Sequence, residues 1–430
     1  MRINPSDSAH KETAILVGVR WENTPAQLTD EYLDELSLLA QTAGAEVLGR
    51  VVQARKRPDA ATFLGKGKAQ SLMRQAAALD CDLIIVDEEL SPTQQRNLQN
   101  LAGEKIKVID RSGLILDIFV RHARTREAKT QVELAQLQYM LPRLSGQWTH
   151  LERQKGGIGT RGGPGETQIE VDRRLVRQRI IKLKSELKHL AADHNTRSKR
   201  RKHSYQVALV GYTNAGKSTL MNSLTNAGVL VEDQLFATLD TTTRRLDLGD
   251  HQPILLSDTV GFIRKLPHHL IASFRTTLAE VAEADLIIKL LDASSPQVED
   301  HLRTIDEVLT ELGVLDNTSL VVLNKVDAIT DRHILASLKR KFPQALMISA
   351  RQRLRLETLE EAILLAHSSH FQAVVLKVPV SAAKLIHEVY RDLEVNNRRD
   401  EDGIVTLEVR GPESALRAVQ HRIRMLAPPE

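Results

Sequence analysis

The stretch Gly211-Tyr212-Thr213-Asn214-Ala215-Gly216-Lys217-Ser218 decides the fold of the central part of this chain. It fits the phosphate-binding pattern of Gly, four residues, Gly-Lys and then Ser or Thr. The apolar residues 207–210 precede it as a buried strand, and residues 218–224 follow it as the start of a helix. In that context successive backbone N–H groups point at one anion, so we expect these eight residues to bind phosphate. Lys217 would reach the outer phosphates, and the Ser218 hydroxyl would ligate Mg²⁺.

Composition sets the class of the protein. A chain of 430 residues predicts about three domains. An apolar share of 42% with 27% charged residues is typical of a globular protein, and 3% aromatic residues argue against an extensive base-stacking surface. Cys81 is the only cysteine, which excludes an intrachain disulfide or a cysteine metal cluster. Residues 1–7 lack a signal-peptide core and no apolar run approaches about 18 residues, so we expect a cytoplasmic protein without a membrane partner.

Positive charge is concentrated in one segment. Residues 121–203 hold twenty Lys or Arg against eight Asp or Glu, a surplus of twelve in a chain of net charge +4. The rest of the chain therefore carries about −8 (4 minus 12). A basic block of this kind indicates a polyanionic partner, although a solvated basic helix face is the alternative.

Residues 1–120 alternate between apolar strands and helical stretches, which predicts an open α/β domain with a parallel sheet. Strands are expected at 14–19, 46–54, 83–86 and 106–109, and helices at 29–40, 69–79 and 93–101. Thr29 or Asp30 would cap the first helix. The segment Gly65-Lys66-Gly67-Lys68 could grip a phosphate, but a turn before a helix is the favoured interpretation.

Residues 121–203 predict a basic antiparallel helical hairpin with a glycine-rich tip and a linker. Two apolar seams with coiled-coil spacing carry the prediction: Leu134, Leu137, Leu141, Leu144, Trp148 and Leu151, then Ile169, Val176, Ile180, Leu183, Leu187 and Leu190. Pro142 and Gly146 would interrupt the first arm. The tip loop 156–165 is longer than packing needs, which favours insertion into folded RNA over a disordered linker. The basic residues 197–202 are a plain linker or a second phosphate contact.

Residues 204–368 predict a P-loop nucleotide domain in which further strands end in polar motifs. Such motifs meet at the carboxyl edge of an open α/β sheet, where ligands bind. A Thr-rich loop at 235–244 would supply a hydroxyl to Mg²⁺, although the residues alone leave open which threonine does so. The expected ligand contacts after the remaining strands are Asp258, Thr259, Val260, Gly261, Asn324, Lys325, Val326, Asp327, Ser349, Ala350 and Arg351.

These motifs have distinct predicted roles. The Asp258 carboxylate would hold Mg²⁺ indirectly, and the Gly261 amide would meet the γ-phosphate. The Asp327 carboxylate would accept from N1–H and N2–H₂ of guanine, a donor pair that adenine lacks. The backbone of residues 349–351 would contact the guanine O6. Four motifs in this order predict a GTP-binding switch.

Phe262 stands where small GTPases carry a water-orienting Gln. A phenyl ring cannot hydrogen-bond a water, so unassisted hydrolysis should be slow and another part of the chain or a partner should supply the missing group. Residues 369–430 predict a small α+β domain for docking, with strands at 374–380 and 403–409 and helices at 381–393 and 412–426.

The motifs together resemble the HflX-type GTPases, a translation-factor-related family of P-loop GTPases. The likeness covers roughly the whole chain and rests most on the glycine loop at 156–168, with further similarity at 127–137, 236–240, 258–262 and 266–270. One difference from the family loop is an additional glycine, Gly163.

The resemblance implies a specific role for this chain. The second nucleotide-contacting segment would be Phe236, Ala237, Thr238, Leu239 and Asp240. Thr238 would join Ser218 on Mg²⁺, and Lys217, Thr238 and Gly261 would serve catalysis. Such GTPases bind the large (50S) ribosomal subunit, place the glycine loop near the peptidyl-transferase region and split stalled or stressed ribosomes. The basic hairpin would then contact ribosomal RNA, and the protein would act as a monomer. A ribosome-assembly or RNA-modifying GTPase, and a structural RNA-binding protein that merely holds GTP, are the alternatives.

Overall fold

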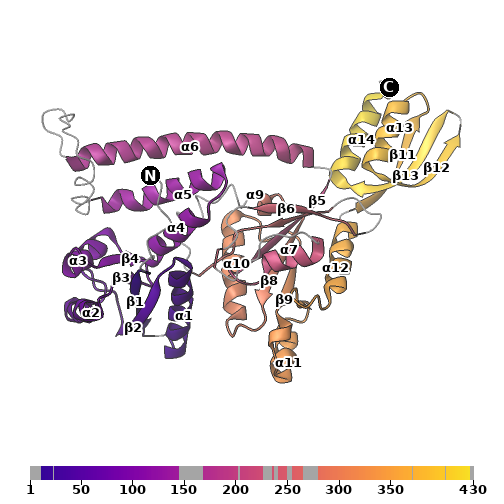
Figure 1. Cartoon of the computed structure of the whole chain (residues 1–430). Coiled ribbons are helices and arrows are strands. Elements are labelled where there is room, and N and C mark those ends of the chain that lie inside the picture. The colour runs from indigo at the N-terminus through magenta and orange to yellow at the C-terminus, as the bar shows by residue number, and fades with distance from the viewer. Residues whose placement is uncertain are drawn as a thin grey trace, which may run out of the picture.

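The computed structural model describes residues 11–22, 24–144, 168–201, 204–225, 235–236, 241–248, 254–264, 279–369, 371–401 and 403–426. Within them the chain forms three separate sheets and one long helical hairpin (Figure 1). The multidomain α/β class predicted from the sequence is confirmed, whereas the boundaries at 120, 203 and 368 stay predictions.

The N-terminal sheet has four parallel strands in the order β2-β1-β3-β4, as predicted. The strands are β1 (Thr13–Trp21), β2 (Glu46–Arg55), β3 (Leu83–Val86) and β4 (Lys107–Asp110). The helices are α1 (Ala26–Thr42), α2 (Lys66–Ala78), α3 (Pro92–Ala102) and α4 (Arg111–His122). Successive side chains of β1 alternate between faces, so Ala14 and Leu16 pack with α1 and α4 while Ile15, Val17 and Val19 pack with α2 and α3.

Two details of this part differ from the predictions. Neither Thr29 nor Asp30 caps the first helix, because α1 begins at Ala26 after Pro25 and Thr29 is buried within its first turn. Helix α4 was not expected; Asp110 caps it by accepting from the Gly113 N–H at 2.9 Å. The predicted turn before α2 is confined to Gly65, which has φ of 87°, because the helix begins at Lys66 and includes residues 66–68.

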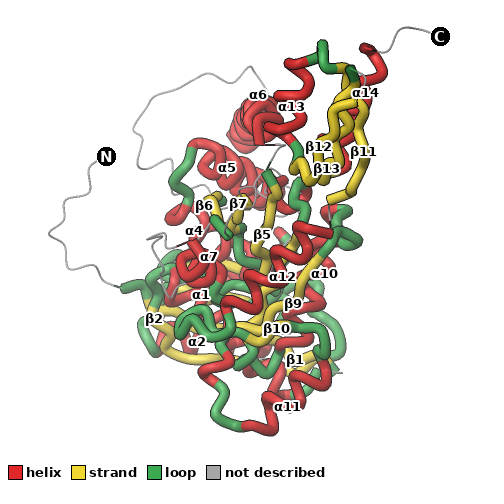
Figure 2. The backbone as a smooth tube through the Cα atoms, turned by 90° about the vertical axis from the view of Figure 1, so that its right-hand side faces the viewer, coloured by secondary structure: helices red, strands yellow, loops and turns green. Residues whose placement is uncertain are grey.

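Helices α5 (Arg126–Met140) and α6 (Gln168–Arg201) pack side by side, as Figures 1 and 2 both show. Leu134, Ile180 and Leu183 form the buried centre of the seam. The interruption at Pro142 is confirmed, because α5 ends at Met140 and the 3₁₀ turn η1 (Leu141–Arg143) follows. Ile169 was wrongly placed in the seam, since it is exposed on the first turn of α6. Trp148, Leu151, Gly146 and the glycine loop lie outside the described residues.

The central sheet has the order β10-β9-β8-β5-β7-β6 and is parallel except for β6. Its strands are β5 (Tyr205–Gly211), β6 (Thr242–Leu246), β7 (Ile254–Asp258), β8 (Leu286–Asp292), β9 (Ser319–Asn324) and β10 (Leu346–Met347). Its helical elements are α7 (Lys217–Thr225), α9 (Ala279–Ala282), α10 (Val298–Leu312), η3 (Val326–Ala328), α11 (Arg332–Lys341) and α12 (Leu356–Ser369). The predicted loop at 235–244 is shorter than expected, because β6 begins at Thr242.

One apolar cluster joins the N-terminal and central sheets. It contains side chains of α1 and α4 together with Tyr212, Phe236 and Phe262 of the central part. Figure 1 shows α1 and α4 on the side of the N-terminal sheet that faces α10. The rings of Phe119 and Phe236 meet edge to face with centroids 4.7 Å apart.

The C-terminal sheet is antiparallel, in the order β11-β13-β12. It comprises β11 (Phe371–Pro379), β12 (Glu394–Glu401) and β13 (Ile404–Pro412), with helices α13 (Ala383–Asp392) and α14 (Glu413–Leu426) packed on it. The α+β prediction is confirmed. Strand β12 was not predicted, because its polar sequence EVNNRRDE lacks the apolar alternation of a half-buried strand. None of the described helices of the chain is both long and apolar enough to cross a membrane.

The hairpin seam makes a testable prediction. Leu183→Ala should lower the free energy of unfolding of the hairpin by about 2–5 kcal/mol, because it removes a buried side chain and leaves a cavity. Ile181→Ala is the matched control: Leu183 is 1% exposed and Ile181, two residues away, is 68% exposed. The control should change stability by no more than about 0.5 kcal/mol. Urea unfolding followed by hydrogen exchange in α5 and α6 measures both, and equal losses would contradict the packing.

Candidate nucleotide-binding site

Four parallel strands bring the predicted motifs to one edge of the central sheet. The phosphate-binding loop follows β5, the Asp258 motif ends β7, the Asn324 motif ends β9 and the Ser349 motif follows β10. Between them β8 ends at Asp292. The predicted convergence at the carboxyl edge is therefore present in the structure.

At two positions of the phosphate-binding loop, neighbouring atoms lie so close to the backbone that only glycine fits without movement. A Cβ on Gly211 would lie 2.4 Å from the Leu290 carbonyl oxygen of β8. Gly216 has φ of 93°, and a Cβ there would lie 2.4 Å from Asn324 Nδ2. Alanine at either position would force the backbone or a side chain to move. Steric crowding therefore explains why the motif has glycine at both positions.

Lys217 is buried at the centre of the loop. Its Nζ donates to the carbonyl oxygens of Gly211 at 3.2 Å and Tyr212 at 3.1 Å. Burial lowers the pKa of Lys217 to about 8, an effect that the Asp258 carboxylate opposes. The loop therefore holds an ammonium group whose charge is costly until an anion arrives.

Oxygen atoms suited to a hard cation lie beside the loop. The Ser218 hydroxyl donates to Asp258 Oδ2 at 2.6 Å, and Asp258 is fully buried. The Thr259 hydroxyl donates to the Leu209 carbonyl at 2.7 Å, which ties the two strands together. Among the described residues no cluster of three or more His, Cys, Asp and Glu could hold a metal by itself. This oxygen set fits Mg²⁺ that is completed by phosphate and water.

The Asn324 motif joins the phosphate-binding loop to the Ser349 motif. Asn324 Nδ2 donates to the Ala215 carbonyl at 2.8 Å, and its Oδ1 accepts from the Ala350 N–H at 2.9 Å. Lys325 has φ of 63° and its Nζ lies 2.8 Å from Asp292 Oδ2. The Val326 N–H donates to the Ile348 carbonyl at 3.3 Å.

Asp327 offers the acceptor that a guanine needs. Its Oδ1 is buried and has no hydrogen-bond partner within the described part of the chain. Ser349 is fully buried and its hydroxyl accepts from the Gln352 N–H at 3.1 Å, while Arg351 is exposed. An unmatched buried carboxylate oxygen is costly, so a donor from a bound base would stabilise this loop.

The segment after Asp258 packs directly on the phosphate-binding loop. Val260 is buried, and a Cβ on Gly261 would lie 2.9 Å from Thr213 Cγ2 and 3.0 Å from Lys217 Nζ. Phe262 is 2% exposed and belongs to the apolar cluster shared with α1 and α4. Its ring therefore packs between the two sheets and cannot orient a water.

The remaining predicted contacts are only partly described. Phe236 is buried and its ring packs on Phe119 of α4. Ala237, Thr238, Leu239 and Asp240 lie outside the described residues.

Sequence reasoning missed the contacts of Tyr212, Glu35 and Arg111. Tyr212 points away from its loop towards Glu35, which pairs with the buried Arg111. An arginine next to the apolar run of α4 was a signal for a buried ion pair. Its partners Glu35 and Asp87 lie 76 and 24 residues away, which no local pattern can identify.

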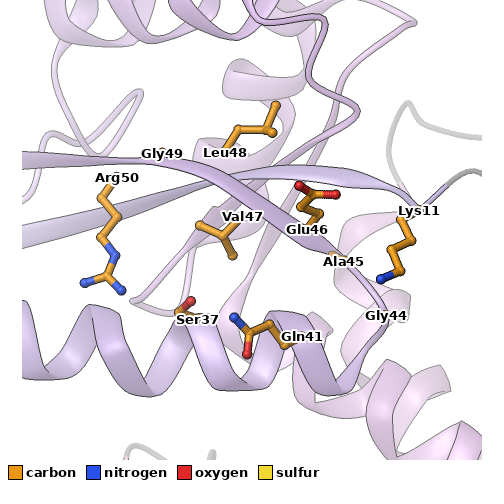
Figure 3. Close-up of a pocket in the computed structure, with 10 residues that line it drawn as sticks. All are labelled: Lys11, Ser37, Gln41, Gly44, Ala45, Glu46, Val47, Leu48, Gly49 and Arg50. Carbon is orange, nitrogen blue, oxygen red and sulfur yellow. The ribbon is translucent and has the colours of Figure 1, made fainter.

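A cavity of about 640 Å³ lies elsewhere, between β2 and α1. Figure 3 shows Val47 and Arg50 reaching from the strand towards Ser37 and Gln41 on the helix. None of the residues that line it belongs to the four motifs. This cavity is therefore separate from the loops of the central sheet that carry the four motifs.

Three family models match the chain in order. They are described as GTP-binding GTPase N-terminal (residues 30–120), GTP-binding GTPase Middle Region (residues 122–201) and 50S ribosome-binding GTPase (residues 206–325). Among solved structures, a GTP-binding protein from the archaeon Sulfolobus solfataricus in complex with GDP is 26% identical, with a TM-score of 0.42. That match covers 83% of this chain and 98% of the other.

Related proteins align with this chain over most of their own length. The GTPase HflX of Escherichia coli is 42% identical over 89% of this chain and 90% of its own. The corresponding protein of Gluconacetobacter diazotrophicus is 40% identical over 94% and 96%, and that of Flavobacterium psychrophilum is 50% identical over 74% and 76%. With these relatives and the three matched regions in chain order, this chain belongs to the HflX family of GTPases.

Proposed function

We propose that this protein binds GTP and GDP with Mg²⁺ and hydrolyses GTP at the edge formed by β5, β7, β9 and β10. The observation that carries the proposal is the double hydrogen bond of Asn324, which holds the phosphate loop and the Ser349 motif in one arrangement. Residues 211–218 would bind the phosphates, with Lys217 on the outer ones. Residues 324–327 and 349–351 would bind the base, with Asp327 selecting guanine.

The proposed Mg²⁺ ligands are Ser218 and Thr238, with Asp258 acting through water. Residues 236–240 would contact the nucleotide, and the Gly261 amide would meet the γ-phosphate. Mg²⁺ would neutralise charge that develops on the phosphates. The 2.6 Å contact between Ser218 and Asp258 supports this oxygen set. Because Phe262 is buried between two sheets, intrinsic hydrolysis should be slow and should need stimulation from outside the central domain.

We further propose that the protein acts as a cytoplasmic monomer on the large (50S) ribosomal subunit and splits stalled or stressed ribosomes. The description of the family model matched at residues 206–325 supports a ribosomal partner. The basic surplus of residues 121–203 supports contact of the hairpin with ribosomal RNA, which the loop 156–165 would extend. The parts 121–203, 204–368 and 369–430 would then serve as RNA probe, switch and docking domain, and the α/β domain at 1–120 would precede them.

Co-sedimentation with isolated large subunits tests the ribosomal role. Binding should be strongest with a non-hydrolysable GTP analogue, and large subunits should accelerate GTP turnover. A chain in which a short polar linker replaces residues 156–165 should keep GTP affinity while losing most of the ribosome-dependent effects. A chain that fails to co-sediment in every nucleotide state would refute the ribosomal role and leave the GTPase proposal standing.

Base selection makes a second prediction. Asp327→Asn should weaken GDP binding by about 100-fold or more, because a buried charge-assisted pair of hydrogen bonds is lost. Binding of xanthosine diphosphate should improve, since xanthine offers an acceptor to the new amide. Asp331→Asn is the control: this exposed residue caps α11 by accepting from the His333 N–H at 2.8 Å. Fluorescence titrations that find no exchange of preference would contradict the assignment.

The depressed pKa of Lys217 makes a third prediction. A bound phosphate favours the charged ammonium, so nucleotide binding should raise the pKa of Lys217 above its free value of about 8. Affinity should then be level below pH 7.5 and fall by about tenfold between pH 7 and pH 9, because binding must take up a proton at the higher pH. GDP titrations across this range measure the slope. Lys217→Met should bind weakly with a flatter profile, and an equally steep profile in that variant would assign the proton to another group.

A further inference from the structure

Tyr212 occupies a position of the phosphate-binding loop where the motif sets no requirement. Its side chain is 6% exposed, and its ring stacks on His301 of α10 with centroids 3.9 Å apart and planes inclined by 15°. The Tyr212 hydroxyl contacts the Glu35 carboxylate of α1 and accepts from the Arg264 N–H at 2.7 Å. The side chain therefore links three segments that are distant in sequence.

Five residues close a ring of hydrogen bonds and ion pairs between the N-terminal and central sheets. From Tyr212 the ring runs to Glu35, then to the buried Arg111, then to Asp87 at 2.8 Å. Asp87 Oδ2 lies 3.5 Å from the Arg264 guanidinium, and the Arg264 N–H returns to the Tyr212 hydroxyl. The Arg264 guanidinium also lies over the Tyr32 ring of α1, 3.2 Å from its centroid. We call these five residues the interdomain ring.

Charge in the interdomain ring is balanced, which explains how it can be buried. Two arginines face two carboxylates, and Tyr212 is the neutral member. Burial and the neighbouring Glu35 carboxylate raise the pKa of Tyr212 well above its ordinary value. The hydroxyl therefore stays protonated, donates to Glu35 and accepts from Arg264. The Tyr212 hydroxyl therefore acts as a fixed hydrogen-bonding group and does not transfer a proton.

Tyr212 helps to fix the position of residues 262–264, the segment that follows Gly261. The Phe262 N–H donates to the Gly211 carbonyl at 2.9 Å, and the Thr213 N–H donates to the Phe262 carbonyl at 2.7 Å. The hydrogen bond from Arg264 to Tyr212 is the third tie between this segment and the phosphate-binding loop. Gly261 stands against Thr213 and Lys217 with no room for a Cβ, so a shift of the segment moves the Gly261 amide relative to Lys217.

We propose that the Tyr212 hydroxyl is a positioning group for GTP hydrolysis, which fixes the segment Phe262–Arg264 against the phosphate-binding loop and makes its position depend on Glu35 of the N-terminal domain. The inference rests on the GTPase activity proposed above. The Gly261 amide serves only a nucleotide that has a γ-phosphate, so loss of the hydroxyl lowers the rate of hydrolysis and spares GDP affinity.

Tyr212→Phe tests the proposal in the full chain. Tyr212→Phe removes the hydrogen bonds to Glu35 and from the Arg264 N–H. The single-turnover rate constant for GTP hydrolysis should fall by about tenfold, which corresponds to about 1.4 kcal/mol in the barrier. GDP affinity should stay within about twofold of the wild type. Tyr139→Phe is the matched control, because the Tyr139 hydroxyl also donates to a buried carboxylate, Asp110, at 2.7 Å, but touches none of the nucleotide motifs. This control should lose stability without losing hydrolysis.

Glu35→Gln tests whether the N-terminal domain contributes to the rate of hydrolysis through Glu35. It keeps the size of the side chain but removes the charge that faces Arg111, so it should slow hydrolysis by several-fold. Tyr212→Phe should cost less in the Glu35→Gln background than alone, because the strengthening of the Tyr212 hydrogen bond by the Glu35 charge can be lost only once. Fully additive effects would overturn the dependence on Glu35.

The remaining outcomes distinguish the two proposals. If the wild-type chain hydrolyses GTP while Tyr212→Phe matches Tyr139→Phe, this inference is overturned and the proposed function stands. If GDP affinity falls in the same proportion as hydrolysis, Tyr212 only supports the loop, and the inference is again overturned. A wild-type chain that does not hydrolyse GTP, with or without large ribosomal subunits, overturns the proposed function and this inference with it.

Discussion

The side-chain amide of Asn324 makes one hydrogen bond to each of two other loops, and the nucleotide-binding edge depends on this geometry. Asn324 is 2% exposed, so neither hydrogen bond competes with bulk water. An aspartate could not donate to the Ala215 carbonyl, and a leucine could do neither. The same amide nitrogen would lie 2.4 Å from a Cβ at position 216, which adds to the preference for glycine that the φ of 93° already sets. The loops proposed to bind the base and the phosphates are thereby joined through one buried side chain.

A second constraint is the apolar cluster that the N-terminal and central sheets share. Phe262 and Phe236 contribute large side chains to it, each worth about 1.5–3 kcal/mol when fully buried. Both belong to segments that flank the proposed γ-phosphate position. A side chain that packs between two domains is not available to orient a water, so the burial of Phe262 is the physical reason for the proposed need for external stimulation. Around the cluster, the interdomain ring adds the directional contacts that apolar packing lacks.

The nucleotide motifs were predictable because each is local: a strand of four to six apolar residues followed by a fixed pattern. The seam of α5 and α6 was visible from heptad spacing for the same reason. The predicted cap at Thr29 was wrong. A threonine near the expected start of a helix favours a capping role, but α1 begins earlier, at Ala26 after Pro25, and the Thr29 side chain is buried. The interdomain ring was beyond reach, since Tyr212 and Glu35 are 177 residues apart and only the packing of two sheets brings them together.

The helical hairpin shows how its charge comes to face outward. Arg126 pairs with Glu186, and Glu133 pairs with Arg179, so the two pairs are seven residues apart on each helix in opposite directions. A spacing of seven residues is the repeat of a coiled coil, because residues two helical turns apart lie on the same face of a helix. The opposite directions are those of an antiparallel pair. The apolar seam fills the inner face and these pairs flank it, using acidic side chains of both helices. Arg177, Lys182, Lys184 and Lys188 are left exposed on α6. These four cations therefore project from a helical backbone that is already ordered, so contact with a phosphate backbone would cost only side-chain entropy.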